Sequence, residues 1–376
     1  MQVRKDTLVN IVLLLLIMPA LAVGAALLWF RRPGAAEKLA VYEKPGEPGS
    51  YETRFEAMGT RGRFQAAAPD AAAAERMFDD ALGQVRMLEA RMSTYRPESE
   101  IGRLNQFGAQ QPVEVSEDTR AVMQKAVEVA RLTNGAFDVA YAPLRTLWRR
   151  AEKEGQVPAP DAIQKTLEAV GSNKLIIEGN RIRFSVPGME VDLGAIAKGY
   201  GVDLAARTLQ QHGAASGIID LGGNLRLFGL PAAGGKWRVL VNPPPGATEQ
   251  IVLALPPCGV ATSGDYERFF TVGSKHFSHI IDPRTGWPVE RMPSVTVVAL
   301  DATTADALGT GVSVMGEKDG LALMEALPEV QCMVMVRQPG GSIRRSMTTG
   351  FDKLIDTITE SRAAAEAPSG QQREGE

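Results

Sequence analysis

The segment DATTADALGTG, residues 301–311, places a carboxylate and a hydroxyl four positions apart, at Asp306 and Thr310. On a helix, side chains four residues apart lie on the same face. Their oxygen atoms are hard ligands that suit Mg²⁺ rather than zinc. Because Mg²⁺ usually takes one or two protein carboxylates and completes its shell with substrate phosphates, the pair predicts a magnesium site beside a phosphate ligand. A capping arrangement on an ordinary helix is the competing interpretation.

A second stretch, VDLGAIAKGYGVD, combines Asp192 and Lys198 with small residues between them. An apolar run ends at Asp192, and a helical pattern starts near Ile196. A helix N-terminus attracts anions through its unpaired N–H groups, and small residues let the backbone approach a ligand closely. Lys198, one turn into the helix, adds a full positive charge. The stretch predicts a phosphate-binding site, against the alternative of a tight strand–helix junction with a surface lysine.

Three further segments contain residue types that contact ligands. His279 precedes an apolar pair and the turn residues of DPRTG, and its near-neutral pKa suits a general base, although a structural histidine is the alternative. Tyr95 in STYRP would stack on an aromatic ligand or pack against the protein. Phe137 and Asp138 follow a Gly turn, where either a ligand close to the backbone or a capped loop fits.

These segments need a scaffold, and the sequence predicts an α+β fold with a mostly antiparallel sheet. Residues 70–92 carry apolar side chains at helical spacing after Asp70 as a cap, and a second helix is expected over 117–132. Residues 174–186 read as a hairpin with Gly179–Asn180 in the turn. There is no regular βαβ alternation and no G-x-G-x-x-G or Walker A sequence. A helix is expected over 304–314, and strands over 216–229, 237–242, 250–256, 267–281, 294–300 and 331–337.

The composition of the 376-residue chain is that of a globular protein, with 44% hydrophobic and 23% charged residues. The net charge is −3 and Lys and Arg form no run beyond short pairs, which argues against a nucleic-acid-binding surface. The two cysteines, Cys258 and Cys332, lie in unrelated segments and cannot form a Cys-rich metal site. The three histidines are too few for a zinc cluster of the usual spacing.

The N-terminus contains an uncharged apolar run from Leu8 to Phe30, flanked by basic residues on both sides. A membrane span needs roughly 20 apolar residues, so this run is long enough. We expect an uncleaved anchor rather than a signal peptide cleaved after Ala20–Leu21–Ala22. The chain is thus expected to divide into the following parts: a membrane anchor or signal sequence (1–30), a linker (31–51), a globular domain (52–358) and a disordered tail (359–376).

Several motifs in order resemble those of the ApbE-like FAD:protein FMN transferases. The resemblance covers roughly residues 52 to 358, nearly all of the globular part. Any one motif is weak evidence for the resemblance, but eight motifs in this order are strong evidence. The motifs are MGT, MSTYRPESEIGRLN, GAFDVAYAPLRTLW, VDLGAIAKGYGVD, IDLGGNL, VATSGDYERFF, HIIDPRTGWPV and ADALGTGVSVMG.

The resemblance implies a T-fold-like α+β domain that takes FAD as its substrate and uses Mg²⁺. Members of the family transfer FMN to a Ser or Thr hydroxyl of an acceptor protein and release AMP. The acceptors are membrane-bound or periplasmic redox proteins, such as subunits of sodium-pumping NADH:quinone reductase, and carry a Ser/Thr-Gly-Ala-Thr-like motif. The expected location is therefore the bacterial inner membrane, with the catalytic domain facing the periplasm.

The resemblance also implies roles for individual residues, carried over motif by motif. His279 matches the histidine proposed as the base. Ala195 matches a position that gives its backbone oxygen to the metal. Gly309 matches a further metal-site position, where family members often carry Ala. The metal site would consist of Ala195, Asp306, Gly309 and Thr310. The FAD contacts would be Met58, Tyr95, Ala136, Phe137, Asp138, Asp192, Lys198 and Ile280.

Alternative functions share the same residues. An FAD pyrophosphatase would use water in place of the acceptor hydroxyl and give free FMN and AMP. A non-catalytic flavin carrier would leave Asp306, Thr310 and His279 without a task. The segment PGATEQ contains a Gly-Ala-Thr core that would allow self-modification at Thr248, although no Ser, Thr or Asp precedes it. In a membrane-tethered scaffold the motifs would be packing turns, which their number and order oppose.

Overall fold

The computed structural model describes residues 39–241, 244, 247, 249–264, 269–289, 294–338 and 342–360. These residues belong to the unit that begins at Leu39. The predicted anchor (1–30), most of the predicted tail and Thr248 lie outside the described residues. No helix within the described ranges is long and apolar enough to span a bilayer.

A nine-stranded sheet forms the centre of the fold, with the strand order β1-β2-β3-β7-β8-β11-β14-β15-β16. All neighbouring strands pair antiparallel. Together with the helices, this confirms the expected α+β class with mostly antiparallel sheet. The strands are β1 (Tyr42–Glu43), β2 (Ser50–Ala57), β3 (Thr60–Ala67), β7 (Gly217–Leu221), β8 (Asn224–Phe228), β11 (Gly259–Ser263), β14 (Ser294–Ala299), β15 (Gln331–Arg337) and β16 (Ile343–Met347).

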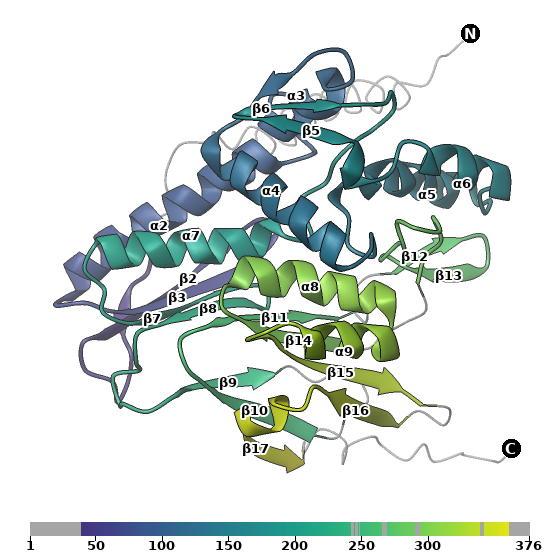
Figure 1. The fold of residues 1–376 in the computed structure, drawn as a ribbon. Helices are drawn as coiled ribbons and strands as arrows, with labels where there is room; N and C mark the ends of the chain where they lie inside the picture. The colour runs from purple at the N-terminus through teal and green to yellow at the C-terminus, as the bar shows by residue number, and fades with distance from the viewer. Residues whose placement is uncertain are drawn as a thin grey trace, which may run out of the picture. The chain divides into compact units, whose positions relative to one another are not determined.

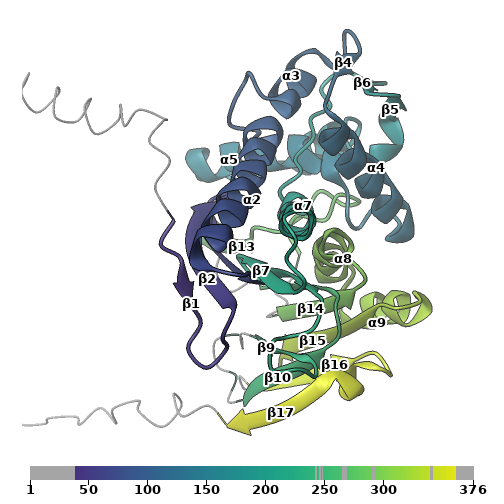
Figure 2. The same ribbon diagram turned by 90° about the vertical axis from the view of Figure 1, so that its left-hand side faces the viewer.

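Helices α2 (Ala71–Met92), α7 (Ala197–Gln211) and α8 (Ala302–Met315) lie along one face of this sheet (Figure 1). Figure 2 shows α7 and α8 end-on, side by side above the strands. Helix α2 forms where the sequence predicts it, because its buried side chains recur at helical spacing and the Asp70 carboxylate accepts a hydrogen bond from the Ala73 N–H at 2.7 Å. Helix α9 (Glu317–Ala326) packs on β15 beside α8.

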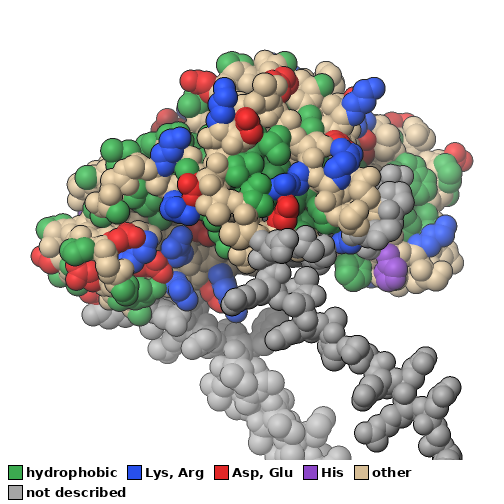
Figure 3. All heavy atoms as spheres, turned by 90° about the horizontal axis from the view of Figure 1, so that it is seen from below, with side chains coloured by type: hydrophobic (Ala, Val, Ile, Leu, Met, Phe, Trp, Pro, Cys, Tyr) green, Lys and Arg blue, Asp and Glu red, His purple; other side chains and the backbone are tan. Residues whose placement is uncertain are grey.

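The opposite face of the central sheet is covered by a three-stranded sheet of order β17-β10-β9 (Figure 2). Its strands are β9 (Trp237–Val241), β10 (Glu249–Leu255) and β17 (Ile355–Glu360), with the short helix η3 (Phe351–Leu354) before β17. Buried side chains of both sheets form one apolar cluster between them. On the face seen from below in Figure 3, acidic and basic side chains are interspersed.

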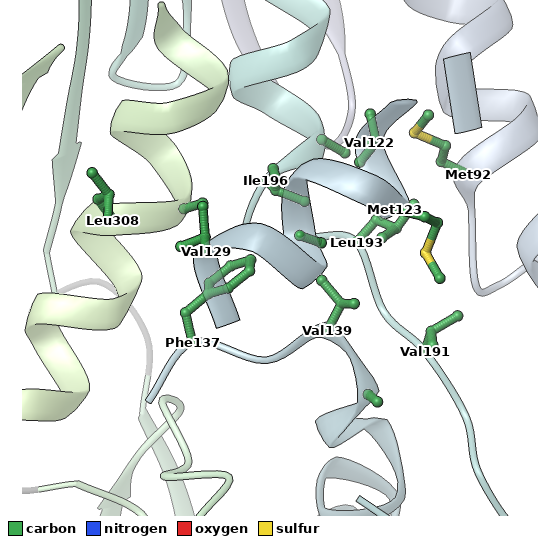
Figure 4. Packing of buried hydrophobic residues seen from close by; sticks show 14 of the residues in the cluster. Met92, Val122, Met123, Val129, Phe137, Val139, Val191, Leu193, Ile196 and Leu308 are labelled. Carbon is green, nitrogen blue, oxygen red and sulfur yellow. The ribbon is translucent and has the colours of Figure 1, made fainter. Parts of the chain in front are cut away.

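Further elements stand above the helix layer (Figure 1). Helix α3 (Glu100–Phe107), helix α4 (Glu117–Leu132) and a small sheet of β4 (Val113–Glu114), β6 (Arg181–Phe184) and β5 (Leu175–Glu178) share one core with α8. Figure 4 shows this packing. Phe137 and Val129 lie beside α8 there, and Leu308 of α8 belongs to the same cluster. The core thus fixes the loops before α7 relative to α8. The short helices η1 (Val139–Tyr141) and η2 (Ser172–Lys174) belong to the same region.

A separate apolar cluster forms around Trp148 of α5 (Ala142–Glu154). It joins α6 (Pro160–Leu167) and the hairpin of β12 (Phe269–Val272) and β13 (Lys275–Ser278). The Trp148 Nε1–H donates a hydrogen bond to the Gly286 carbonyl at 2.8 Å. This bond ties α5 to the segment that follows His279.

The expected helices at 70–92 and 117–132 and the hairpin at 174–186 are confirmed. The expected strand over 216–229 is instead the hairpin of β7 and β8, because Gly222 and Gly223 adopt positive φ angles of 60° and 84° and turn the chain. The described fold starts at Leu39, whereas the sequence predicts a linker up to residue 51. Strand β1 lies within that interval and pairs with Tyr51 and Glu52 of β2, so this part of the predicted linker is structured.

Candidate active site

Helices α7 and α8 pack so closely that only glycine fits at one contact. A Cβ added to Gly199 would lie 2.3 Å from the Ala302 carbonyl oxygen and 2.8 Å from the Asp306 Cβ. The Gly199 N–H donates to Asp306 Oδ2 at 2.9 Å, across 107 positions of sequence. The GAIAKG stretch therefore joins the predicted phosphate site to the predicted metal site through a direct backbone contact.

The Asp306 carboxylate is buried, with the residue only 4% exposed. Its Oδ1 lies 3.7 Å from the Lys198 Nζ, and that ammonium also donates to the Gly194 carbonyl at 3.4 Å. Burying a carboxylate is costly unless it is paired and hydrogen-bonded, and Asp306 is both. Thr310, one turn further along α8, is half-buried. The structure thus brings together the two charged residues that the sequence assigned to metal and phosphate.

A second link between the helices comes from Asp203, which the sequence analysis did not select. Its carboxylate accepts the N–H groups of Ala302 at 3.1 Å and Thr303 at 2.9 Å, and also the Thr303 hydroxyl at 2.6 Å. The contacts step backward along α8 as they step forward along α7, so the helices run antiparallel. Burial raises the pKa of Asp203. Its spacing could have indicated this role, since Asp203 lies one turn after Gly199 on the same face of the helix.

The loop before α7 is held by Asp192. Its Oδ1 accepts the Gly194 N–H at 2.7 Å, and its Oδ2 forms an ion pair with Nη1 of Arg145 on α5. Its own N–H donates to the Val139 carbonyl at 2.8 Å. The carboxylate predicted to contact FAD is therefore already engaged with the protein, and Arg145 is a residue that sequence reasoning missed. Ala195, in the same loop, is half-buried.

The predicted flavin segment 136–138 contributes its side chains to the protein interior. Ala136 and Phe137 are each 1% exposed, and Phe137 packs in the core of Figure 4. The Asp138 carboxylate accepts the N–H groups of Ala140 at 2.8 Å and Ser172 at 2.7 Å, together with the Ser172 hydroxyl. This segment therefore presents its backbone rather than these side chains for any ligand contact.

The other predicted site residues lie on three separate segments, which contain Met58, Tyr95 and the pair His279 and Ile280. Met58 has a φ of 50° in the β2–β3 turn and packs beside Gly201 of α7, whose added Cβ would lie 3.3 Å from the Met58 Cε. His279 is exposed just after β13. Ile280 is half-buried, and its N–H donates to the Ser278 hydroxyl at 3.1 Å.

Tyr95, between α2 and α3, is 74% exposed. Its hydroxyl accepts a hydrogen bond from Arg149 Nη2 at 2.9 Å, and the Arg149 guanidinium lies 5.7 Å from its ring centroid. This hydrogen bond lowers the pKa of Tyr95. The phenol is therefore held in place at the surface by a cation rather than packed in the core.

The donors at Asp306 fit a hard cation that takes part of its shell from a substrate. Among the residues that the structure describes, no group of three or more His, Cys, Asp or Glu side chains could enclose a metal. Asp306 and Thr310 offer only oxygen ligands, which suits Mg²⁺. The Lys198 ammonium beside Asp306 shows that positive charge is accommodated at this point. Gly309 packs against the end of β11, where an added Cβ would lie 3.2 Å from Ser263 Oγ.

The sequence profile of the ApbE family matches residues 58–334, which include every predicted site residue. The chain belongs to the ApbE family. A protein of Vibrio cholerae named FAD:protein FMN transferase is 38% identical over 264 residues, which cover 68% of this chain and 79% of that protein. One of Haemophilus influenzae with the same name is 33% identical over 300 residues, covering 76% of this chain and 85% of that protein.

Solved structures of the ApbE family share the fold. The flavin transferase ApbE of Vibrio cholerae matches with a TM-score of 0.71 at 32% identity, covering 81% of this chain and 99% of that one. The apo form of the Pseudomonas stutzeri flavinyl transferase ApbE matches with a TM-score of 0.72 at 27% identity, covering 85% and 98%. The resemblance read from the motifs is thereby confirmed, and the chain is an enzyme of the transferase class.

Proposed function

We propose that this protein transfers FMN from FAD to a Ser or Thr hydroxyl of an acceptor protein, with Mg²⁺, and releases AMP. The names of its relatives support flavin transfer. One structural observation carries the chemistry: a buried carboxylate, Asp306, faces the Lys198 ammonium at 3.7 Å on two packed helices. This pair supplies both a hard metal ligand and a positive charge for a phosphate, as phosphoryl transfer requires.

In the proposed reaction, the acceptor oxygen attacks the phosphorus on the riboflavin side of the FAD diphosphate. A new phosphoester bond forms, the P–O bond to the AMP phosphate breaks, and AMP leaves with the bridging oxygen. His279 accepts the proton of the acceptor hydroxyl. Lys198 offsets charge on the diphosphate. Asp306 and Thr310, with the backbone oxygens of Ala195 and Gly309, would hold Mg²⁺, which when bound neutralises developing phosphate charge.

Binding of FAD is assigned to the remaining predicted contacts on the segments around this pair. Tyr95 and Ile280 would contact the ligand with side chains that the protein leaves accessible in part. The segment 136–138 would contact it through the backbone. The residues assigned to FAD are Met58, Tyr95, Ala136, Phe137, Asp138, Asp192, Lys198 and Ile280.

The proposed location is the bacterial inner membrane, with residues 1–30 as anchor and the T-fold-like domain facing the periplasm. The uncharged run from Leu8 to Phe30 supports the anchor. The acceptor would be a redox protein with a Ser/Thr-Gly-Ala-Thr-like motif. Oxidation-sensitive thiols are not exposed in the described domain, since Cys258 and Cys332 are both buried and free.

The test is to incubate the full chain with FAD, Mg²⁺ and an acceptor that carries the motif. We expect the intact mass of the acceptor to rise by one FMN group while AMP appears in equal amount. Removal of Mg²⁺ with a chelator should stop both. AMP and free FMN with an unmodified acceptor would instead show hydrolysis of FAD. Unchanged FAD, with acceptor and Mg²⁺ present, would contradict the proposed function.

A further inference from the structure

One buried polar atom beside the candidate site has no use in the fold. Arg145 lies in the first turns of α5, and its Nη1 pairs with Asp192. Its Nε is buried and, among the described residues, has no hydrogen-bond partner. A buried donor without a partner costs about 1–3 kcal/mol. Native proteins leave few such atoms, and each one calls for a physical reason.

A second arginine lies close to Arg145. Arg149 follows one turn later on the same face of α5, and its guanidinium contacts the Tyr95 phenol and ring. The positive charges of both arginines contribute to lowering the pKa of Tyr95. Asp192 balances one of the two charges. This edge of α5 therefore carries two cations, and the Arg145 Nε–H is a donor without a partner among the described residues.

A short network connects this edge to Asp306. Asp192, held by Arg145, accepts the Gly194 N–H at 2.7 Å, and the Gly194 carbonyl accepts from the Lys198 Nζ at 3.4 Å. Lys198 in turn faces Asp306. Arg145 and Lys198 thus flank the same four-residue backbone segment, 192–195. A ligand with two negatively charged groups that lies along this segment would meet a cation at each end.

We propose that Arg145 is a further substrate-binding residue, whose Nε–H donates to an oxygen of the FAD diphosphate while its Nη1 keeps Asp192 in place. The inference rests on the proposed function, because it assigns Arg145 to the same ligand. Arginine suits this double task, since its planar guanidinium presents several donors in fixed directions. Lysine retains the charge but cannot serve Asp192 and a phosphate with the same geometry.

The test is a direct measurement of FAD affinity on the full chain in detergent, with Mg²⁺ present, by quenching of flavin fluorescence. For Arg145→Met, we expect the Kd for FAD to rise between about 10-fold and 100-fold, which is the loss of a charge-assisted hydrogen bond. The Kd of Arg145→Lys for FAD should lie between that of the unmodified chain and that of Arg145→Met. The matched control is Arg150→Met on the same helix, where the arginine side chain is 68% exposed and forms an ion pair with Glu154 at 3.5 Å. It should bind FAD as the unmodified chain does.

Competition with ADP and with riboflavin locates the contact on the ligand. We expect Arg145→Met to weaken ADP and to leave riboflavin unchanged. Equal weakening of riboflavin would place Arg145 at the flavin ring, and unchanged FAD affinity in both Arg145 variants would show that the arginine only holds Asp192. Either result overturns the proposal. Because binding is measured without an acceptor, a chain that binds FAD through Arg145 but transfers nothing would refute the proposed function alone.

If Arg145→Met does not fold, the proposal is tested with Arg145→Lys alone. Its thermal unfolding should match that of the unmodified chain, since a cation still faces Asp192. FAD affinity equal to that of the unmodified chain would then contradict donation by the arginine Nε–H. A rise in Kd that disappears at high salt for all variants alike would also contradict it, because a directed hydrogen bond at a buried atom is screened less than surface charge.

Discussion

Two regions of the candidate site are built differently. The contact between α7 and α8, which contains Gly199, Asp203 and Asp306, is buried and internally hydrogen-bonded. The rim, formed by Tyr95, Arg149 and His279, consists of exposed side chains on separate segments. We call the first region the helix clamp and the second the rim. The clamp side chains are held by contacts within the fold, whereas the rim side chains are exposed to solvent.

The difference fits the two halves of the proposed reaction. Charge on a diphosphate is stabilised best by groups that are already in position and need no reorganisation. The acceptor is a protein, so the region that receives its hydroxyl must remain open to solvent. We therefore expect substitutions in the clamp to change the rate or the stability strongly, and substitutions of Tyr95 and Arg149 in the rim to act more weakly.

Among the residues around Asp306, the largest effect on the transfer rate is expected at Lys198. Lys198→Met removes the ammonium that faces Asp306 and retains a long aliphatic chain. The transfer rate should fall by about 100-fold, as when one preorganised electrostatic group is removed from an active site. The measurement is the initial rate of FMN attachment, with thermal unfolding as the control. A rate within twofold of the unmodified chain would show that Lys198 is a surface lysine.

Packing of the clamp is tested by paired glycine substitutions. An added Cβ at Gly199 would lie 2.3 Å from a backbone carbonyl, whereas one at Gly309 would lie 3.2 Å from the Ser263 hydroxyl. Gly199→Ala should lower the free energy of unfolding by about 1–3 kcal/mol, because overpacking forces the helices apart. Gly309→Ala should change it by less. Chemical denaturation measures both, and equal effects would mean that the clamp is looser than its contacts indicate.

At the rim, removal of one hydroxyl should have a small effect. Tyr95→Phe loses the hydrogen bond from Arg149 but keeps the aromatic ring. Because the residue is exposed, we expect the free energy of unfolding to change by less than about 0.5 kcal/mol. FAD affinity should fall by a few-fold at most if the ring provides the contact. A loss as large as that for Lys198→Met would place the phenol in the chemistry and remove the contrast between rim and clamp.

The smallest expected effect concerns the reactivity of the two buried cysteine thiols. Burial raises the pKa of Cys258 and of Cys332 to about 12. Since the thiolate is the reactive form, a pKa above the usual range leaves almost none of it at pH 8, and its fraction grows as the pH rises toward 12. A chromogenic disulfide reagent should therefore find no reactive thiol in the native protein at pH 8 and two after denaturation. Rapid reaction of the native chain would show that the layers open.

The sequence indicated the parts of the clamp but not their contact. The helical spacing of Asp306 and Thr310 and the helix start near Ile196 are local patterns, and both helices are confirmed. The bond from Gly199 to Asp306 joins residues 107 positions apart, and no local pattern predicts such a pairing. The ion pair between Arg145 and Asp192 was missed for the same reason.

Two further features that the sequence did not show have local causes. Strands β2 and β3 were not expected, because their residues include few β-branched side chains and several Gly, Ala and charged residues. Asp138 stays a predicted FAD contact, and the sequence did not show that its carboxylate accepts hydrogen bonds from Ala140 and Ser172. A polar residue after a Gly turn is equally suited to both tasks, and only the tertiary partner decides between them.

The most direct test of the account is the Mg²⁺ dependence of transfer in Asp306→Asn, because asparagine preserves the acceptor for the Gly199 N–H while removing the charge. FMN attachment to the acceptor is followed by intact mass across a Mg²⁺ titration, with unfolding temperature as the control. We predict a variant that folds like the unmodified chain, transfers at least about 100-fold more slowly and no longer saturates with Mg²⁺ at the same concentration. Full transfer with an unchanged Mg²⁺ requirement would contradict the assignment of the helix clamp as the reaction centre.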